Sequence, residues 1–237
     1  MCTVTYLPTT EGYIITHNRD EAPSRSPHAI ERSDIGGTPC LFPRDTGAGG
    51  AWVAAVQQGP TICLLNGAFV KHERTPPYRR SRGLILLDLL AQPDWPSFVS
   101  AYDLQNIEPF TLLFFDRSTA SELRWDGARK HVQYLPATAP AFWCSATLYP
   151  PEMQARREAV FRQWYAQQQP PVSAAAILNL HHTGSVGDPE NDFVMNRGNR
   201  VRTVSITQVV VGSNTLMTYH DLLLGRSDAK FLPETPA

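Results

Sequence analysis

The chain has 237 residues, of which 42% are hydrophobic and 18% are charged, and its formal net charge is -1. This length and composition predict a globular protein that folds as one domain over residues 1–237. Because a surface that binds a phosphate backbone needs a clear excess of basic residues, the near-neutral charge excludes nucleic acid as an expected partner.

The sequence shows no pattern typical of membrane insertion or export. The longest dense apolar run, residues 83–91, is interrupted by Asp88 and is shorter than the roughly 18 apolar residues of a spanning helix, so we expect no integral membrane segment. The first residues lack the basic and apolar regions of a signal peptide. Four cysteines without any CxxC pair fit reduced thiols in a cytoplasmic protein: Cys2, Cys40, Cys63 and Cys144.

The amino-terminal segment predicts a β-hairpin. Residues 3–7 alternate polar and apolar side chains, and residues 13–18 are rich in β-branched side chains. Residues 8–12 between them are turn formers. We expect Leu7 to pair with Tyr13 across this turn in an antiparallel register.

This register decides which side chains lie beside Cys2. It places Cys2 opposite Asn18, and the two-residue period of a strand then puts Asn18 and Asp20 on the same face as Cys2. A shift by one residue would put His17 and Arg19 there instead. In either register, the returning strand brings this polar segment close to the cysteine.

Downstream, groups of strands alternate with groups of helices. Residues 22–50 are expected to form a loop. Strands are predicted at 51–57, 61–66, 110–116, 120–126, 130–136, 202–211 and 215–222. Helices are predicted at 83–91, 95–103, 151–169 and 173–182. This order, without regular βαβ alternation, predicts an α+β fold of stacked, mainly antiparallel sheets covered by helices.

Cys2 directly follows the initiator methionine, and removal of Met1 would make it the N-terminal residue. The α-amino group, with a reference pKa near 8, could then take the proton of the thiol, whose reference pKa is about 8.5. Nucleophile and base would occupy one residue, as in the N-terminal threonine enzymes. The alternative is a small buried side chain with a structural role.

Three polar side chains could assist such a thiol, and each has a structural alternative. Asp20 could hold the ammonium, and Arg19 could lower the thiol pKa or bind an anionic group. The two could equally neutralise each other at a strand end. The amide of Asn66 could donate to a developing oxyanion, but because a glycine follows it, a type I′ hairpin turn is the alternative there.

No cofactor or metal site is expected. The glycine-rich residues 46–52 lack the G-x-G-x-x-G spacing of a nucleotide loop and open no helix. His181 and His182 are adjacent, so they cannot face one ion as helical residues four apart do. The basic residues 71–82 are interpreted either as a solvated loop or as a rim that binds anions.

Several segments, in the same order, resemble those of a known family. They are residues 1–8, the tetrapeptide NRDE at 18–21, and residues 49–67, 78–83 and 201–209. Together they resemble the NRDE family, whose eukaryotic relative is transport and Golgi organisation protein 2. That family is similar to the N-terminal nucleophile hydrolases of the choloylglycine hydrolase and penicillin V acylase group, which implies a four-layer αββα sandwich.

The resemblance also implies roles for particular residues. Cys2 would attack an amide carbonyl, and Asp20 would support it. Asn66 would line the oxyanion hole, and Arg202 would assist. Asn18 matches the family pattern as well, and we assign it to substrate binding.

Two positions depart from the acylase pattern. The acylases carry an arginine three residues before the aspartate, a place that His17 holds here. Arg19 lies on the same strand face and could supply the charge, and His17 is counted among the substrate-binding residues. A second asparagine of the acylase site is replaced by Ala146.

Two functions follow from these observations. The first is a cysteine hydrolase that cleaves a linear amide, a non-peptide C–N bond, or a related acyl bond through a thioester on Cys2. The alternative, implied by the eukaryotic relative, is a non-catalytic protein that binds or transfers a lipid or haem in the same cleft. The expected partner is therefore a small acyl or amide substrate or a hydrophobic ligand, and a homo-oligomer stays open.

Overall fold

The fold consists of two sheets that pack face to face, with helices on both outer surfaces. A computed structural model describes residues 2–25, 29–92 and 94–233. Its described residues form two seven-stranded sheets, and every pair of neighbouring strands is antiparallel.

The first sheet contains both the first and the last strand of the described chain. In spatial order its strands are β10 (Ala141–Cys144), β1 (Cys2–Pro8), β2 (Tyr13–Glu21), β12 (Val201–Val211), β13 (Thr215–Asp221) and β14 (Arg226–Leu232). A short strand, β11 (Asn196–Arg197), also pairs with β12. The amino-terminal hairpin is therefore central in this sheet and has neighbours on both sides.

The second sheet follows the order of the chain. Its strands are β3 (Ile30–Ile35), β4 (Thr38–Pro43), β5 (Val53–Val56), β6 (Thr61–Asn66), β7 (Phe110–Phe115), β8 (Ala120–Trp125) and β9 (Lys130–Leu135). Its middle strands are buried on both faces because helices cover one side and the first sheet covers the other.

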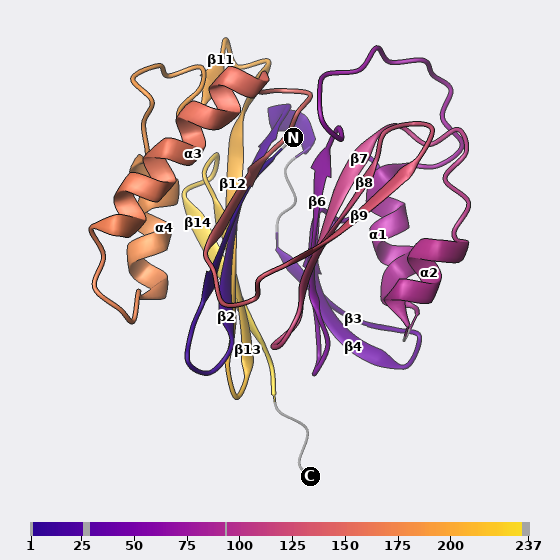
Figure 1. Cartoon of the computed structure of the whole chain (residues 1–237), viewed down its shortest axis with the longest axis horizontal. Coiled ribbons are helices and arrows are strands. Elements are labelled where there is room, and N and C mark those ends of the chain that lie inside the picture. The colour runs from indigo at the N-terminus through magenta and orange to yellow at the C-terminus, as the bar shows by residue number, and fades with distance from the viewer. Residues whose placement is uncertain (1, 26–28, 93, 234–237) are drawn as a thin grey trace.

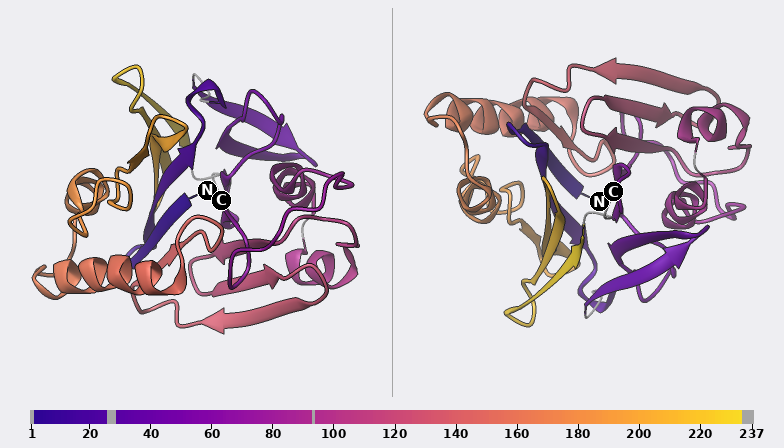
Figure 2. Two further views of the ribbon diagram at one scale, coloured as in Figure 1. Left: turned by 90° about the horizontal axis from the view of Figure 1, so that it is seen from above. Right: turned by 90° about the horizontal axis from the view of Figure 1, so that it is seen from below.

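Four α-helices complete the layers: α1 (Arg82–Leu90), α2 (Trp95–Ala101), α3 (Pro151–Ala166) and α4 (Ala174–Thr183), with a short 3-10 turn at Pro23–Arg25. Figure 1 shows α3 and α4 outside the first sheet and α1 and α2 outside the second, and Figure 2 shows the same layers from above and below. The expected four-layer αββα sandwich of α+β class is confirmed. Within the described ranges, no helix is long and apolar enough to cross a membrane.

Local sequence explains how the helices begin and which side they bury. Helix α4 starts after Ser173, whose hydroxyl accepts a hydrogen bond from the backbone N–H of Ala176, the arrangement of an N-cap. Helix α3 starts at Pro151, whose fixed φ suits the first helical position. Helix α1 buries a stripe at helical spacing against the second sheet, made of Ile85, Leu86, Leu89 and Leu90.

Aromatic side chains join the two sheets in the central layer. The ring of Tyr6 on β1 stacks on that of Phe115 on β7, with centroids 4.9 Å apart. The hydroxyl of Tyr13 on β2 donates to the carbonyl oxygen of Phe115 at 2.6 Å. This contact fixes the hairpin against the facing sheet, so the position of Cys2 at the other end of β1 is fixed as well.

Most of the predicted elements form close to their predicted bounds, but several strands were not predicted. The expected loop at 22–50 contains β3 and β4, and no strand was expected where β10 and β14 lie. Strand β3 lies at the edge of its sheet and has four consecutive polar residues between Ile30 and Ile35, and β4 contains two prolines, a residue that is depleted in strands. These strands are formed by tertiary pairing and have little propensity signal of their own.

The predicted register of the first hairpin is wrong by one residue. Leu7 pairs with Ile14, and Pro8 pairs with Tyr13. The turn closes through a hydrogen bond from the Thr9 N–H to the Gly12 carbonyl oxygen at 2.9 Å, so Pro8 stays in the strand. This register places the apolar residues Tyr13 and Ile15 in the layer between the sheets, where they join the core.

We predict that Gly50→Ala destabilises the fold. A Cβ at Gly50 would lie 2.4 Å from the backbone carbon of Gly83, the residue whose carbonyl oxygen accepts from Ala51 N–H at 3.1 Å. The expected loss is about 1–3 kcal/mol, typical of overpacking. Urea unfolding would measure it, with Gly212→Ala as control, because its Cβ would meet the nearest atom, in Glu11, at an ordinary 3.4 Å. Equal stability of the two variants would contradict this close approach.

Candidate active site

Cys2 lies at the rim of the layer between the sheets, at the first position of β1. It is 3% exposed and lines a small cleft of about 80 Å³. The other walls come from the end of β2, the segment 45–52, the end of β6 around Asn66, and the start of α1. The cleft is small compared with the few hundred Å³ of a typical ligand pocket, so it has room for a reacting group only.

Ser145 fixes the backbone of Cys2 from both sides. The backbone nitrogen of Cys2 donates to the Ser145 Oγ at 2.8 Å, and the Ser145 N–H donates to the Cys2 carbonyl oxygen at 2.9 Å. Ser145 is completely buried and follows β10, which pairs with β1. Sequence reasoning missed this residue, although it directly precedes the position where the resemblance indicates a missing asparagine, Ala146.

Arg19 lies directly opposite Cys2 in the observed register and on the same face of the sheet. Its guanidinium forms an ion pair with Asp45, donates to the Arg25 carbonyl oxygen at 2.5 Å and lies 4.0 Å from the ring centre of Trp52. Asp45 is itself fixed by two backbone N–H groups and by a 2.6 Å ion pair with Arg25. The positive charge beside Cys2 is therefore fixed in place.

Burial and charge act in opposite directions on the Cys2 thiol. Burial raises its pKa, and the carboxylate of Asp20 adds to this, while the Arg19 guanidinium opposes it. The net direction is upward, so Cys2 is a thiol rather than a standing thiolate in this environment. An attack by sulfur therefore needs a base that takes the proton as the bond forms.

Asn66 ends β6 and reaches the same cleft. The alternative of a hairpin turn is wrong: Asn66 pairs with Phe110 on β7, and a long connection with two helices joins the two strands. Gly67 has a φ of +83°, and its carbonyl oxygen accepts from Thr111 Oγ1 at 2.9 Å. Among the described residues the Asn66 side-chain amide has no hydrogen-bond partner, so it can donate to a ligand.

Ala146 lies next to the turn that Asn66 and Gly67 form. A Cβ built on Gly67 would be 3.3 Å from the Ala146 Cβ and 2.9 Å from the Thr147 Cγ2, so the Ala146–Thr147 backbone packs directly on the Asn66–Gly67 turn. Ala146 is 5% exposed. A methyl group thus occupies the place where the resemblance implies a second amide.

Asp20 lies on the opposite face of the sheet, so the expectation that it shares the face of Cys2 is wrong. Its carboxylate accepts from Thr203 Oγ1 at 2.7 Å and from the Tyr149 hydroxyl at 3.0 Å. Burial raises its pKa, and the Arg157 guanidinium opposes that shift. The shift by one residue in the hairpin moves Asp20 from the cleft to the layer under α3.

Asn18 also faces the helices, outside the cleft. Its Nδ2 donates to the carbonyl oxygens of His181 at 3.0 Å and Phe193 at 2.8 Å. Its Oδ1 lies 2.6 Å from the His181 Nδ1, which must donate, so the His181 Nε2 accepts from Thr5 Oγ1 at 2.8 Å. Both polar atoms of the Asn18 side chain are therefore used to hold α4 and the backbone at Phe193 on the sheet.

His17 and Arg202 do not line the cleft. His17 lies two residues before Arg19 on the same strand face and is completely buried, and burial holds its pKa well below the usual value. Arg202 on β12 lies opposite Glu21 in the register, and Glu21 does line the cleft. Of the seven predicted site residues, the structure brings Cys2, Arg19 and Asn66 together in one cleft.

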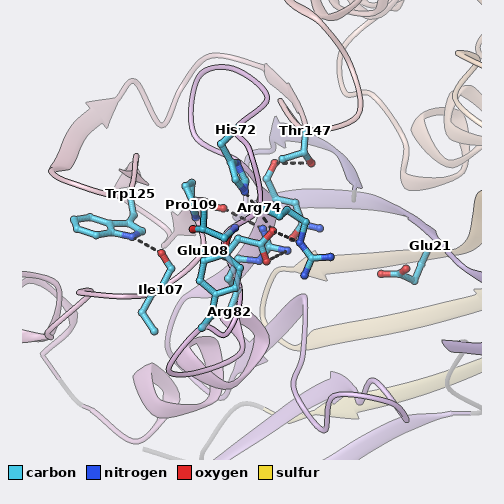
Figure 3. A network of polar contacts seen from close by, with 12 residues as sticks. Glu21, His72, Arg74, Arg82, Ile107, Glu108, Pro109, Trp125 and Thr147 are labelled. Carbon is cyan, nitrogen blue, oxygen red and sulfur yellow. Dashed lines mark hydrogen bonds and ion pairs between the residues drawn. The ribbon is translucent and has the colours of Figure 1, made fainter.

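A second cationic group was not predicted as part of the site. Arg82 lines the cleft, forms a 3.1 Å ion pair with Glu108 and donates to the Pro109 carbonyl oxygen at 3.1 Å. His72 and Arg74 bind the same carboxylate, as Figure 3 shows. This network holds residues 71–82 against the second sheet. The residues that line the cleft carry three guanidinium groups and two carboxylates, so their net charge is positive.

Within the described ranges, no group of three or more histidine, cysteine, aspartate or glutamate side chains is placed to hold a metal ion.

A family model described as transport and Golgi organisation 2 matches residues 1–183. The chain belongs to the transport and Golgi organisation 2 family. The resemblance inferred from the NRDE tetrapeptide is therefore confirmed. None of the curated proteins compared with the chain matches it.

Solved structures support the same fold. An N-acylethanolamine-hydrolyzing acid amidase ortholog from Caenorhabditis elegans is 12% identical, with a TM-score of 0.59 over 88% of this chain and 92% of that one. Two variants of a conjugated bile acid hydrolase from Clostridium perfringens are each 10% identical, with TM-scores of 0.60 and 0.59 over 97% of this chain and 92% of theirs. At such identities the likeness shows the fold of this chain and nothing beyond it: the four-layer αββα sandwich that these hydrolases share.

We predict that His181 makes the protein less stable in acid. Burial, followed by the nearby charges of Arg157 and His182, lowers the pKa of His181 from 6.5 to about 3. The unfolded state therefore binds a proton between these values that the folded state does not, and stability falls as the pH drops from about 6.5 to 3. In His181→Gln, the slope of unfolding free energy against pH should decrease by about 1.4 kcal/mol per pH unit, the value for one proton.

Urea unfolding at several pH values would measure this slope, with exposed His131→Gln as the control. An unchanged slope in the His181 variant would show that this imidazole is protonated in the folded protein.

Proposed function

We propose that this protein is a cysteine hydrolase that cleaves a linear amide, a non-peptide C–N bond, or a related acyl bond. The observation that carries this proposal is one cleft that contains the thiol of Cys2, the fixed charge of Arg19 and the Asn66 amide, which has no partner among the described residues. Met1 lies outside the described residues, and its removal is part of the proposal. The fold shared with an amidase and with a bile acid hydrolase supports it.

The first step forms a thioester. The α-amino group of Cys2 takes the thiol proton, and the sulfur attacks the carbonyl carbon of the substrate. The carbonyl oxygen becomes an oxyanion and accepts a hydrogen bond from the Asn66 amide. The C–N bond then breaks, and the leaving amine departs with the proton that the α-amino group held.

The second step returns the free enzyme. Water attacks the thioester, the α-amino group takes its proton, and the C–S bond breaks to release the acid and the thiol. Ser145 Oγ accepts from the Cys2 nitrogen, so it would orient the lone pair of the α-amino group toward the thiol. We propose Ser145 as a positioning residue for this base.

The cations of the cleft favour negative charge in the substrate. Arg19 and Arg82 are both largely buried, and burial lowers the pKa of each guanidinium while the Asp45 and Glu108 carboxylates oppose that shift. Since both remain cations at neutral pH, they would stabilise the oxyanion and an anionic group near the cleaved bond. Four of the residues predicted from the sequence lie outside the cleft, and we propose only a supporting role for them: Asp20, Asn18, His17 and Arg202.

The alternative is a binding or transfer protein for a lipid or haem on the same fold. Two observations favour it: a methyl group at Ala146 where the acylase pattern has an amide, and a Cys2 thiol whose pKa is raised by burial. In such a protein Cys2→Ala would bind ligand as the native protein does. In the hydrolase, Cys2→Ala would abolish turnover and keep the fold.

We predict selective labelling of Cys2 in the processed chain. Burial raises the pKa of Cys40 to about 11 and of Cys144 to about 12, and it raises the pKa of Cys63 well above its usual value. In the processed chain the α-amino group of Cys2 can take the proton of its own thiol, a base that the other three cysteines lack. At pH 8, iodoacetamide should therefore modify one cysteine, and intact-mass and peptide analysis should place it on an N-terminal Cys2. The control is a chain with an added N-terminal segment, in which Cys2 should react much more slowly. Retention of Met1 in active protein would contradict the proposal.

We predict that Asn66→Ala lowers kcat by about 10²–10³-fold with little change in KM, because one oxyanion donor contributes this much. Fluorogenic acyl anilides of increasing chain length would serve as substrates. The control is Asn179→Ala, an exposed asparagine on α4. If kcat in Asn66→Ala equals that of the control, Asn66 does not contact the oxyanion.

A further inference from the structure

The inner face of the first sheet carries polar side chains beside Cys2, where the core would be expected to be apolar. One cross-strand row runs from Cys2 through Arg19 and Ser205 to Asp221. In the next row, His17 lies opposite Thr207 on β12. Further along the same strands, the layer is filled by apolar and aromatic side chains.

These two rows concentrate buried polar atoms that lack partners. Within the described residues, eleven buried side-chain nitrogen or oxygen atoms have no hydrogen-bond partner, and six of them lie here. They are His17 Nδ1 and Nε2, Ser205 Oγ, Thr207 Oγ1, Asp221 Oδ2 and Trp52 Nε1. Trp52 belongs to the facing side of the layer, where its ring packs on the Arg19 guanidinium at 4.0 Å.

Six unpaired polar atoms on five side chains of one layer are too costly for a dry interior. Each buried donor or acceptor without a partner costs about the desolvation free energy of that group, and native proteins contain few such atoms. The groups of this cluster are chemically complementary to water: Trp52 donates, Asp221 accepts, and the hydroxyls of Ser205 and Thr207 do both. Neutral His17 offers one donor and one acceptor.

We propose that an internal cluster of ordered water occupies this part of the layer, held by His17, Thr207 and Ser205 and reaching Trp52 and Asp221. A buried water typically makes about three hydrogen bonds to groups of this kind. His17 and Cys2 are diagonal neighbours on β2 and β1, so their side chains share the inner face with Cα atoms about 7–8 Å apart. His17 thus positions water beside the Cys2 thiol.

This inference does not depend on the proposed hydrolysis, because hydration and thiol reactivity are both measurable without turnover. It also gives a reason for a polar side chain at position 17, where an apolar residue would otherwise complete the core. The water cluster supplies the exchangeable protons for the buried thiol, which has no side-chain hydrogen-bond partner of its own among the described residues.

The first test uses stability and structure. If the site were dry, Thr207→Val would remove an unpaired hydroxyl at constant shape, so the variant would melt at a higher temperature than the native protein. If the site is hydrated, the variant melts at a lower temperature, and a high-resolution crystal structure of the native protein shows water within hydrogen-bond distance of Thr207 Oγ1 and His17. The control is Thr218→Val, because Thr218 on β13 pairs with Gln208 and therefore lies on the other face of the sheet from Thr207.

The second test uses the rate of iodoacetamide alkylation of Cys2. We expect about a tenfold loss in His17→Phe, less than the ~10²–10⁴ of a direct base. His17→Gln keeps a donor and an acceptor and should recover most of the rate. A higher melting temperature of Thr207→Val, or equal alkylation rates in His17→Phe and His17→Gln, would overturn the inference. Loss of hydrolysis with intact hydration would affect the proposed function only.

Discussion

The pairing of Cys2 with Arg19 across the first hairpin is the constraint on which the site depends. Strands β1 and β2 are buried on both faces, so each side chain must suit either the layer between the sheets or the layer under the helices. A shift of one residue would exchange the two sets completely. It would move Asn18 and Asp20 into the cleft and place Arg19 under α3 and α4, where no carboxylate like Asp45 would meet it.

The two faces of the hairpin have different tasks. On the helix side, Asn18 with His181, and Asp20 with Tyr149 and Thr203, form saturated hydrogen-bond networks. The fully buried Arg157 adds to that layer by donating to Thr3, although its Nε has no partner among the described residues. Such satisfied networks fix one register and one helix position. On the inner side, polar atoms are left free for other partners.

The sequence identified the nucleophile candidate better than its surroundings. Cys2, Arg19 and Asn66 could be selected because short-range pattern and family resemblance place them near one another. Ser145 could not, since it lies 143 residues from the nitrogen that it binds. Glu108, which fixes Arg82 beside the cleft, is likewise distant in sequence from the hairpin. Contacts of this kind are set by sheet pairing and loop packing, which local propensity does not encode.

The layer order was predictable because the alternation of strand groups and helix groups limits the architectures available. The register was not, because both candidate registers place β-branched or aromatic residues in the core. The turn decided between them: the bond from Thr9 to Gly12 closes a four-residue connection and keeps Pro8 paired with Tyr13. One local hydrogen bond thus determined which of the NRDE side chains reach the cleft.

The central claim is that the Cys2 sulfur carries the acyl group of the substrate during turnover. Acid quenching within one turnover of an acyl anilide, followed by trypsin digestion and mass spectrometry, tests it directly. The account predicts a peptide that begins at Cys2 and ends at Arg19, heavier by the mass of the acyl group, and no such adduct in Cys2→Ala. Hydrolysis at an undiminished rate in Cys2→Ala, or turnover by protein whose peptide still begins with Met1, would contradict it.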